Sequence, residues 1–268
     1  MRTSAIAAYI LLAFLAPAGV AIAQQPSADE LARSLSNPVA SLISVPFQYN
    51  YDYGFGSEDG SRNTLNIQPV VPASISDDWN LITRVILPVV YQDDVLGNSG
   101  SQFGLGDTTP TLFFSPKEPT RGGLIWGVGP VFLLPTATDE LLGGEKWGIG
   151  PSVVMLKQTT AGLTYGILAN HIWSVAGDDD RADISNTFLQ PFVSKALGKG
   201  RTITFNTESS YNWEDSQWTV PLNLQYTVVK RWGKQLVSIG GGGRVFLETP
   251  DGGPDWGLRL IVTLLYPR

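Results

Sequence analysis

The sequence predicts an all-β protein: a transmembrane antiparallel β-barrel of about 12 strands with a short N-terminal helical segment. Apolar and aromatic side chains alternate with polar side chains or glycine in one stretch after another. Several of these stretches reach roughly ten residues, the length that a tilted strand needs to cross a bilayer. The chain also has 29 Gly, 8 Trp and 9 Tyr, a composition that favours β-structure with aromatic belts.

The composition argues against several other classes of protein. After the N-terminus, no apolar run approaches the roughly 20 residues of a membrane-spanning helix. The 268 residues include no Cys, so disulfide and thiolate chemistry are excluded. A net charge of −6 argues against a nucleic-acid partner. A soluble β-rich protein remains the alternative, although such a protein would use shorter strands and hide its aromatic side chains in a core.

Residues 1–23 have the pattern of a secretory signal peptide. Arg2 supplies the positive end, residues 5–16 form an apolar core, and Ala21-Ile22-Ala23 is a small-x-small cleavage site before Gln24. An uncleaved anchor helix is the alternative, but the apolar core is too short to span a bilayer. We therefore expect export through a cleaved signal peptide to the outer membrane of a Gram-negative cell.

Residues 24–44 are predicted to form a periplasmic or lumenal segment before the barrel. Ser27 and Glu30 have the spacing of a helix capping box. Apolar residues then recur on one side as far as Ile43, interrupted at Asn37-Pro38. The pattern predicts a short, broken helix against or inside the periplasmic mouth, and a disordered leader is the alternative.

The barrel itself is expected over residues 45–268, beginning with a strand at residues 45–55. One face of this strand would carry Val45, Phe47, Tyr49, Tyr51, Tyr53 and Phe55, and the other Pro46, Gln48, Asn50, Asp52 and Gly54. Aromatic side chains on one face and amide or carboxylate groups on the other are typical of a barrel with lipid outside and water inside.

Eleven further strands complete the prediction. They are expected near residues 64–75, 79–92, 103–115, 124–134, 147–157, 163–175, 184–197, 202–213, 218–228, 236–248 and 256–266. The pattern leaves open which residues face inward at 103–115 and 184–197. Because the strand number is even, both termini are expected on the periplasmic side, with long acidic loops outside and short basic turns inside.

The acidic loops and the last strand suggest partners. Acidic side chains at the outer rim can bind divalent cations that bridge lipopolysaccharide, although solvated loops are the simpler interpretation. Asp178-Asp179-Asp180 lacks the spaced oxygen ligands of a calcium loop. The last strand alternates as far as Tyr266 near the chain end, similar to the C-terminal signal that the outer-membrane assembly machinery recognises. Outer-membrane lipid is the remaining expected partner, and the oligomeric state stays open.

Polar side chains on the inward faces are the candidate pore lining. The set comprises Arg84, Asn206, Glu208, Asn223, Gln225, Arg244 and Arg259. A ring of such groups can form a constriction that selects small anions or polar solutes. These residues favour a passive channel for small solutes. The alternatives are a non-conducting barrel, in which Glu208 pairs with an Arg and the network fills the lumen, and a soluble ligand-binding protein.

A glycine patch lies on the inward face of the predicted hairpin at residues 122–157. It consists of Gly127, Gly129, Gly148 and Gly150. Glycine in a strand permits close approach or strong bending. We therefore expect an inward-folded loop or the N-terminal segment to pack against this patch and narrow the pore.

His171, the sole histidine, is the one candidate for catalysis. Some outer-membrane barrels are lipid hydrolases that use Ser and His on the outer wall. Ser174 is three residues away and points to the opposite face, so only a Ser on a neighbouring strand remains. A position in the aromatic belt beside Trp173 is the simpler interpretation. With one His and no Cys, the usual zinc sites are excluded, and no catalytic residue, metal or cofactor is predicted.

Several motifs resemble those of a known family. They include Gly129-Pro130, Pro135-Thr136-Ala137-Thr138-Asp139, Gly144-Glu145-Lys146-Trp147 and Gly150-Pro151-Ser152, with further stretches at residues 37–46, 104–107, 169–174, 188–192, 206–209 and 218–221. The chain resembles a family of proteobacterial outer-membrane proteins. Members are labelled as transporters or after the meta-pathway of phenol degradation, and some carry the misleading label neuromedin U. The resemblance implies an outer-membrane barrel and supplies no catalytic residues.

Overall fold

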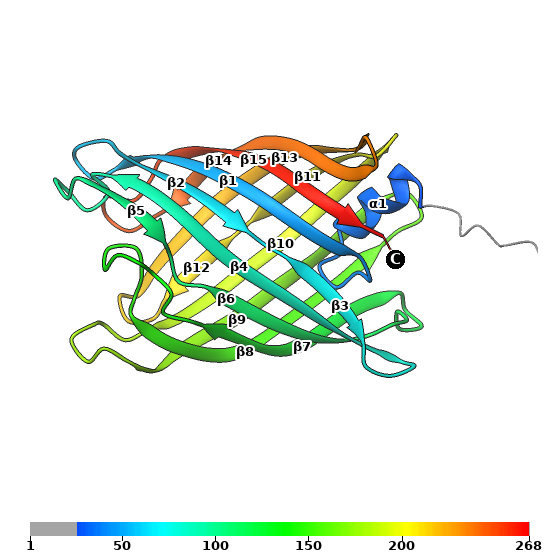
Figure 1. Ribbon diagram of the computed structural model, residues 1–268, viewed down its shortest axis with the longest axis horizontal. Helices are drawn as coiled ribbons and strands as arrows, with labels where there is room; N and C mark the ends of the chain where they lie inside the picture. Colours follow the sequence, from blue (N-terminus) through cyan, green and yellow to red (C-terminus); the bar gives the residue numbers. More distant parts are fainter. Residues whose placement is uncertain (1–25, 268) are drawn as a thin grey trace, which may run out of the picture.

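The computed structural model describes residues 26–267, which form a closed antiparallel β-barrel (Figure 1). The predicted signal peptide and its cleavage site lie outside the described residues. The strands are β1 (Ile43–Phe55), β2 (Gly60–Ile67), β3 (Val70–Ser74), β4 (Trp79–Asp93), β5 (Ser101–Leu105), β6 (Thr109–Pro116), β7 (Leu124–Leu133), β8 (Lys146–Gln158), β9 (Leu163–Gly177), β10 (Ser185–Gly198), β11 (Arg201–Thr207), β12 (Ser209–Asn212), β13 (Gln217–Trp232), β14 (Gln235–Glu248) and β15 (Trp256–Tyr266).

These segments form the 12 strands of the barrel wall, as predicted. The segments β2 and β3 count as one interrupted strand, and so do β5 and β6 and likewise β11 and β12. Both members of each pair are hydrogen-bonded to the same neighbouring strand. The barrel closes between the first and last strands, from Ile43 opposite Tyr266 to Tyr53 opposite Trp256. Both ends of the described chain lie at the same end of the barrel, which we call the terminal end (Figure 1).

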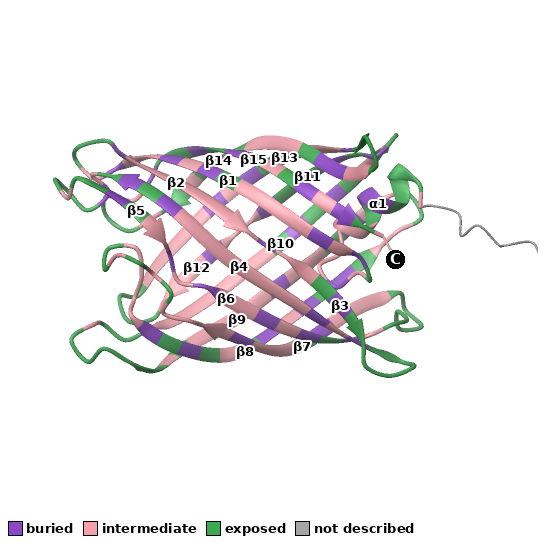
Figure 2. Ribbon diagram, viewed as in Figure 1, coloured by how far each residue is buried: buried purple, intermediate pink, exposed green. Residues whose placement is uncertain are grey.

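The alternation of faces follows the sequence pattern. The outer wall exposes large apolar side chains such as Tyr91, Trp173, Leu224 and Leu260, and the loops at both ends are the most exposed backbone (Figure 2). The structure also shows which residues face inward in the strands expected at 103–115 and 184–197. Thr111, Phe113 and Ser115 of β6 are buried on the inner side, and Phe188, Gln190, Phe192 and Ser194 of β10 line an inner cavity.

The prediction for Phe55 in the first strand is wrong, because its side chain points inward and not outward. The register of β1 against β2 shifts between Tyr53 and Phe55, and Gly54 between them has a φ of 94°. An extra residue in one strand makes the side chains that follow it point to the opposite face of the sheet. Phe55 is consequently only 7% exposed and packs under the Arg62 guanidinium, whose central carbon lies 5.1 Å from the ring centre.

The N-terminal segment contains helix α1 (Ala28–Leu35), whose start is the predicted capping box. Ser27 Oγ accepts a hydrogen bond from Glu30 N, and Glu30 Oε2 accepts one from Ser27 N at 2.7 Å. The helix is shorter than the apolar pattern suggested and ends before Pro38, since proline disfavours helical backbone in the preceding residue. Ile43, the end of that pattern, already belongs to β1.

The N-terminal segment fills the terminal end of the barrel. Leu31, Ala32 and Leu42 pack with Val229 of β13 and Leu265 of β15. Val39 reaches further along the lumen. Its buried neighbours there are Ile82, Phe113, Val154, Leu156, Leu168 and Phe192. The segment therefore lies inside the barrel wall as a floor to the lumen, with its apolar residues against two different parts of the wall.

The capping box predicts a pH-dependent helix. The hydrogen bond from the Ser27 backbone lowers the pKa of Glu30 below its usual value. A carboxyl with a lowered pKa stabilises the fold above its usual pKa, and this contribution is lost as the pH falls through the lowered value. Between about pH 6 and about pH 3, which spans the range of a glutamate carboxyl, we expect amide exchange in α1, corrected for its intrinsic pH dependence, to become faster. Glu30→Gln keeps an oxygen acceptor without a titrating group, so an equal pH response in this variant would refute the explanation.

Candidate functional site

Arg259 is the centre of a charged layer across the lumen. Its guanidinium donates to both carboxylate oxygens of Glu208, at 2.8 Å and 2.7 Å, and Nε donates to Asn50 Oδ1 at 2.7 Å. Two parallel bonds between a guanidinium and a carboxylate are among the strongest charge-assisted pairs. The Arg259 side chain is 2% exposed and that of Glu208 is 20% exposed, so the guanidinium is buried and the carboxylate is partly open to the lumen.

A second ion pair joins Arg244 and Asp52 beside the first. Arg244 Nε lies 3.4 Å from Asp52 Oδ1, and Nη1 donates to Oδ2 at 3.5 Å. Gly257 lies directly opposite both residues in the β14–β15–β1 register. A Cβ at Gly257 would come within 2.3 Å of Asp52 Oδ1 and 2.8 Å of Arg244 Cγ. The missing side chain at Gly257 therefore makes room for the ion pair.

Arg62 extends the layer toward the opposite end of the barrel. Its Nε donates to Gln92 Oε1 at 2.9 Å, and Gln92 Nε2 donates to Gln102 Oε1 at 2.9 Å and to Leu141 O at 3.4 Å. Leu141 belongs to the loop between β7 and β8. Arg62 is thus connected to the loop between β7 and β8 through the Gln92 side chain.

The loop between β7 and β8 is fixed by polar side chains from other loops. Asp107 accepts hydrogen bonds from Ala137 N at 3.1 Å and Gly144 N at 2.7 Å. Arg181, in the loop after β9, donates to the Glu140 carbonyl at 2.7 Å. Asp183 in the same loop pairs with Lys146, and the bonds from Lys146 and Ser174 lower the pKa of Asp183. The loop is therefore held at the mouth of the barrel from two sides.

All seven residues of the predicted pore lining lie on the inside of the barrel. Arg259, Glu208 and Arg244 form the charged layer. Asn223 Nδ2 donates to Asn206 Oδ1 at 2.9 Å just beside it, and Arg84 and Gln225 line a cavity next to it. The sequence-based selection omitted Asp52, Arg62, Gln68 and Gln92, which belong to the same network. Asp52 has the inward phase of the first predicted strand, whereas Arg62 falls between the predicted strands at residues 45–55 and 64–75.

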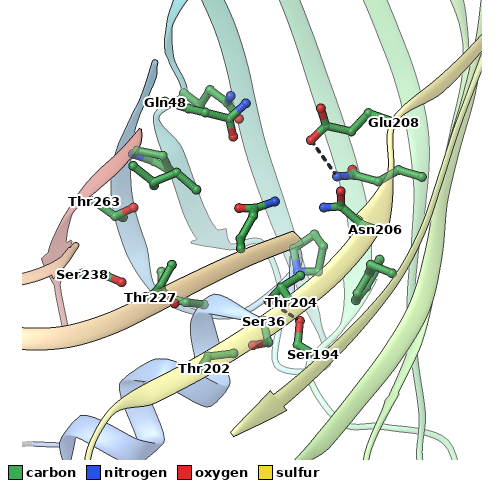
Figure 3. Close-up of a pocket in the computed structure, with 18 of the residues that line it drawn as sticks. Ser36, Gln48, Ser194, Thr202, Thr204, Asn206, Glu208, Thr227, Ser238 and Thr263 are labelled. Atoms are coloured by element: carbon green, nitrogen blue, oxygen red, sulfur yellow. Dashed lines mark hydrogen bonds between the residues drawn. The ribbon is translucent and has the colours of Figure 1, made fainter. Parts of the chain in front are cut away.

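A cavity of about 410 Å³ separates the charged layer from the N-terminal segment. Ala32, Leu35, Ser36 and Pro38 form its floor. Hydroxyl groups, including Ser194, Thr202 and Ser36, lie at the end beside the helix, and Glu208 and Gln48 lie at the other end (Figure 3). The cavity is lined mainly by uncharged polar groups, and the charged side chains that line it are Arg84 and Glu208.

The four glycines of the predicted patch have different neighbours. A Cβ on Gly127 would lie 3.2 Å from Val39 Cγ1, so the N-terminal segment packs directly against this glycine. Gly148 is covered by Ile172 and Leu133. At Gly129 and Gly150 a Cβ would collide with a carbonyl oxygen of the adjacent strand, so backbone approach, and not the N-terminal segment, accounts for those two positions.

His171 lies on the outer wall among aromatic rings. Its ring centre is 4.1 Å from that of Trp173 and 6.5 Å from that of Trp213. His171 Nδ1 and Thr187 Oγ1 are 2.7 Å apart, and Nε2 is 3.5 Å from Ser185 Oγ. Trp213 Nε1 also donates to Thr187 Oγ1 at 2.8 Å. Within residues 26–267 no carboxylate is hydrogen-bonded to His171, so the third group that would orient a catalytic base is missing there.

Two further properties concern the described chain alone. In residues 26–267, no group of three or more His, Asp or Glu side chains is arranged to hold a metal ion. No helix within residues 26–267 is long and apolar enough to cross a membrane.

Comparison with known proteins gives a structural likeness without a sequence match. No protein-family model matches the chain, and no curated protein matches it either. An outer membrane channel from Pseudomonas putida F1 has a similar fold, with a TM-score of 0.67 and 14% identity over 84% of this chain and 96% of that one. The β domain of the Bordetella autotransporter BrkA gives a TM-score of 0.42 and 12% identity, over 82% of this chain and 98% of that one. At this identity, the likeness to the channel concerns the fold.

The Arg259–Glu208 pair leads to a stability prediction. Removing one partner of a buried ion pair leaves an uncompensated charge and costs about 3–5 kcal/mol, whereas replacing both partners by apolar groups is often neutral. We expect Glu208→Ala to lower the free energy of unfolding by this amount in denaturant titrations of the refolded protein. Adding Arg259→Met should recover most of the loss. Lys157→Gln, at an exposed position of β8, serves as the control, and an equal loss in the single and double variants would contradict the assignment.

Proposed function

We propose that this protein is an outer-membrane β-barrel that acts as a passive channel for small solutes. The observation that carries the proposal is the polar cavity and charged layer inside a closed barrel whose outer wall is apolar. A wet lumen behind a lipid-compatible wall is the arrangement of channel-forming barrels. The fold likeness to a bacterial outer membrane channel supports the same function.

Localisation and partners follow from this proposal. Both described termini would lie on the periplasmic side, which makes the terminal end periplasmic and places the loop between β7 and β8 outside. Trp147, Trp173 and Trp213, all exposed near that outer end, suit a membrane interface. Lipid, lipopolysaccharide and the assembly machinery are the proposed partners. The sequence motifs add the proposal that the chain belongs to the proteobacterial transporter family described above.

A non-conducting barrel is the second candidate, and the N-terminal segment favours it. The segment packs across the terminal end, and Val39 contacts the far wall next to Gly127. The charged layer is also largely paired, so a part of the lumen is filled by protein. Conduction then depends on whether water and solutes pass beside the segment or only after it moves.

Planar-bilayer recording distinguishes these two candidates. We expect discrete conductance steps from the refolded protein and larger steps from a variant lacking residues 26–41, because the deletion removes the floor of the cavity. Phe205→Leu, a change on the outer wall, is the control and should conduct like the original protein. Steps from the deletion variant alone would indicate a plugged barrel. Silence from both across voltages and salts would refute the channel.

A lipid hydrolase is the remaining alternative, supported by the hydroxyl groups that contact His171 on the outer wall. If His171 acts as a general base, hydrolysis of phospholipid or lipopolysaccharide acyl chains should disappear in His171→Ala and in the variant lacking the attacking hydroxyl, Ser185→Ala or Thr187→Val. We expect no hydrolysis above background from the unaltered protein. Measurable release of fatty acid that is lost on His171→Ala would reverse this expectation.

A further inference from the structure

We propose that the cavity above the N-terminal segment is a binding site for small hydroxylated carboxylates, such as hydroxy acids and sugar acids, with Arg84 as the group that binds the carboxylate. The inference rests on the proposed channel function in one respect, since it names the substrate class of that channel. The site consists of Arg84, Gln48, Asn66, Gln68 and Gln225, together with the hydroxyl groups at the helix end of the cavity.

Arg84, unlike Arg244 and Arg259, has little of its hydrogen-bonding capacity used. In the described chain Arg62 also makes a single hydrogen bond, to Gln92, but it does not line the cavity. Its Nη2 donates to Gln68 Oε1 at 3.1 Å, and within residues 26–267 it makes no salt bridge. Arg259 and Arg244, by contrast, each have a carboxylate partner. A guanidinium has five N–H donors in a fixed fork. Most of the donors of Arg84 are therefore available to a ligand in the cavity that it lines.

The acidic group that interacts with Arg84 is already paired with another arginine. Glu208 interacts with Arg84 electrostatically, but both carboxylate oxygens of Glu208 already accept hydrogen bonds from Arg259. In the wider layer, the four arginines Arg62, Arg84, Arg244 and Arg259 outnumber the two carboxylates Asp52 and Glu208. The cavity therefore lies in a positive field, and a fork of free donors fits a carboxylate better than a point charge does.

The rest of the lining is suited to a ligand with a hydroxylated body. The side-chain amides of Gln48, Asn66 and Gln225 make no hydrogen bond to the described residues and lie around the cavity. Thr202 Oγ1 is buried without a partner in the same range. Hydroxyl groups of Thr204, Thr227, Ser238 and Thr263 share the lining. The Thr204 hydroxyl is bonded to that of Ser194, whereas the buried Thr202 hydroxyl lacks a described partner and is costly to bury unless a ligand or water satisfies it. A sugar acid offers donors and acceptors to this hydroxyl and to the amides.

The size of the cavity limits the class further. A volume of about 410 Å³ is at the small end of the range for small-molecule sites. The helix and Pro38 close one end. Small monomeric acids therefore fit, and chains of several sugars do not. Gluconate is a suitable probe, and glucose is its neutral counterpart.

The test is isothermal titration calorimetry of the refolded full chain with gluconate and with glucose. We expect gluconate to bind, glucose to bind at least about tenfold more weakly, and Arg84→Gln to weaken gluconate by a similar factor, since each removes a charge-assisted bidentate contact. Arg201→Gln is the matched control: it removes the same charge from an exposed position that does not line the cavity, so its affinity should stay near that of the original protein. Where Arg84→Gln fails to fold, Arg84→Lys replaces it and should also bind more weakly.

The outcomes separate this inference from the proposed channel. Unchanged gluconate affinity in the folded Arg84 variant, equal affinity for glucose, or no gluconate binding would each overturn the site. In planar bilayers, gluconate should reduce the current of the original protein and not that of Arg84→Gln. Conductance steps that gluconate leaves unaffected would overturn the site and leave the channel intact. Binding in calorimetry without any conductance would support the site and refute the channel.

Discussion

The closed ladder between β1 and β15 is the constraint on which the other features depend. A sheet with an open edge leaves a row of backbone N–H and C=O groups unpaired, and these groups are costly in apolar surroundings. Pairing from Ile43 opposite Tyr266 to Tyr53 opposite Trp256 removes both edges. Once the sheet is closed, strand alternation sorts the side chains into an outer wall and a lumen. The lumenal charges can then lie far from bulk water while the outer wall stays apolar.

Within the closed wall, the charged layer contributes little net stability to the fold. Moving Arg259 and Glu208 out of water carries a desolvation penalty that their pairing only offsets, and apolar residues of similar size would often be equally stable. The strand register nevertheless brings Asn50 opposite Arg259 and leaves Gly257 without a side chain beside Asp52 and Arg244. A layer that adds little stability yet is accommodated by its neighbours fits the proposal that it interacts with solutes in the lumen.

The sequence predicted the barrel well because strand alternation is local. Tyr49, Leu65, Tyr91 and their outward neighbours needed only a period of two, and so did the inward Arg259. Two kinds of information are not local. The bulge at Gly54 reverses Phe55. A glycine inside a strand permits a bulge, but the alternation alone does not show that the register against β2 shifts there. Which inward groups meet across the lumen depends on the stagger of strands distant in sequence, such as Glu208 and Arg259. The lining could therefore be predicted as a set, whereas its pairing could not.

The enclosure of the cavity has two parts of unequal strength. The wall is made of continuous ladders, and opening it between strands breaks many backbone hydrogen bonds at once. The floor is held by a few hydrogen bonds and by apolar contacts. Gln158 Nε2 donates to Arg33 O at 2.8 Å, Gly200 N to Asp29 Oδ1 at 2.6 Å, and Asn80 Nδ2 to Ser41 Oγ at 3.1 Å. Segments with few backbone bonds to their surroundings open at lower free energy than core strands. Displacement of the N-terminal segment is therefore the least costly way to connect the cavity with the terminal end of the barrel, and the barrel wall can stay intact while it happens.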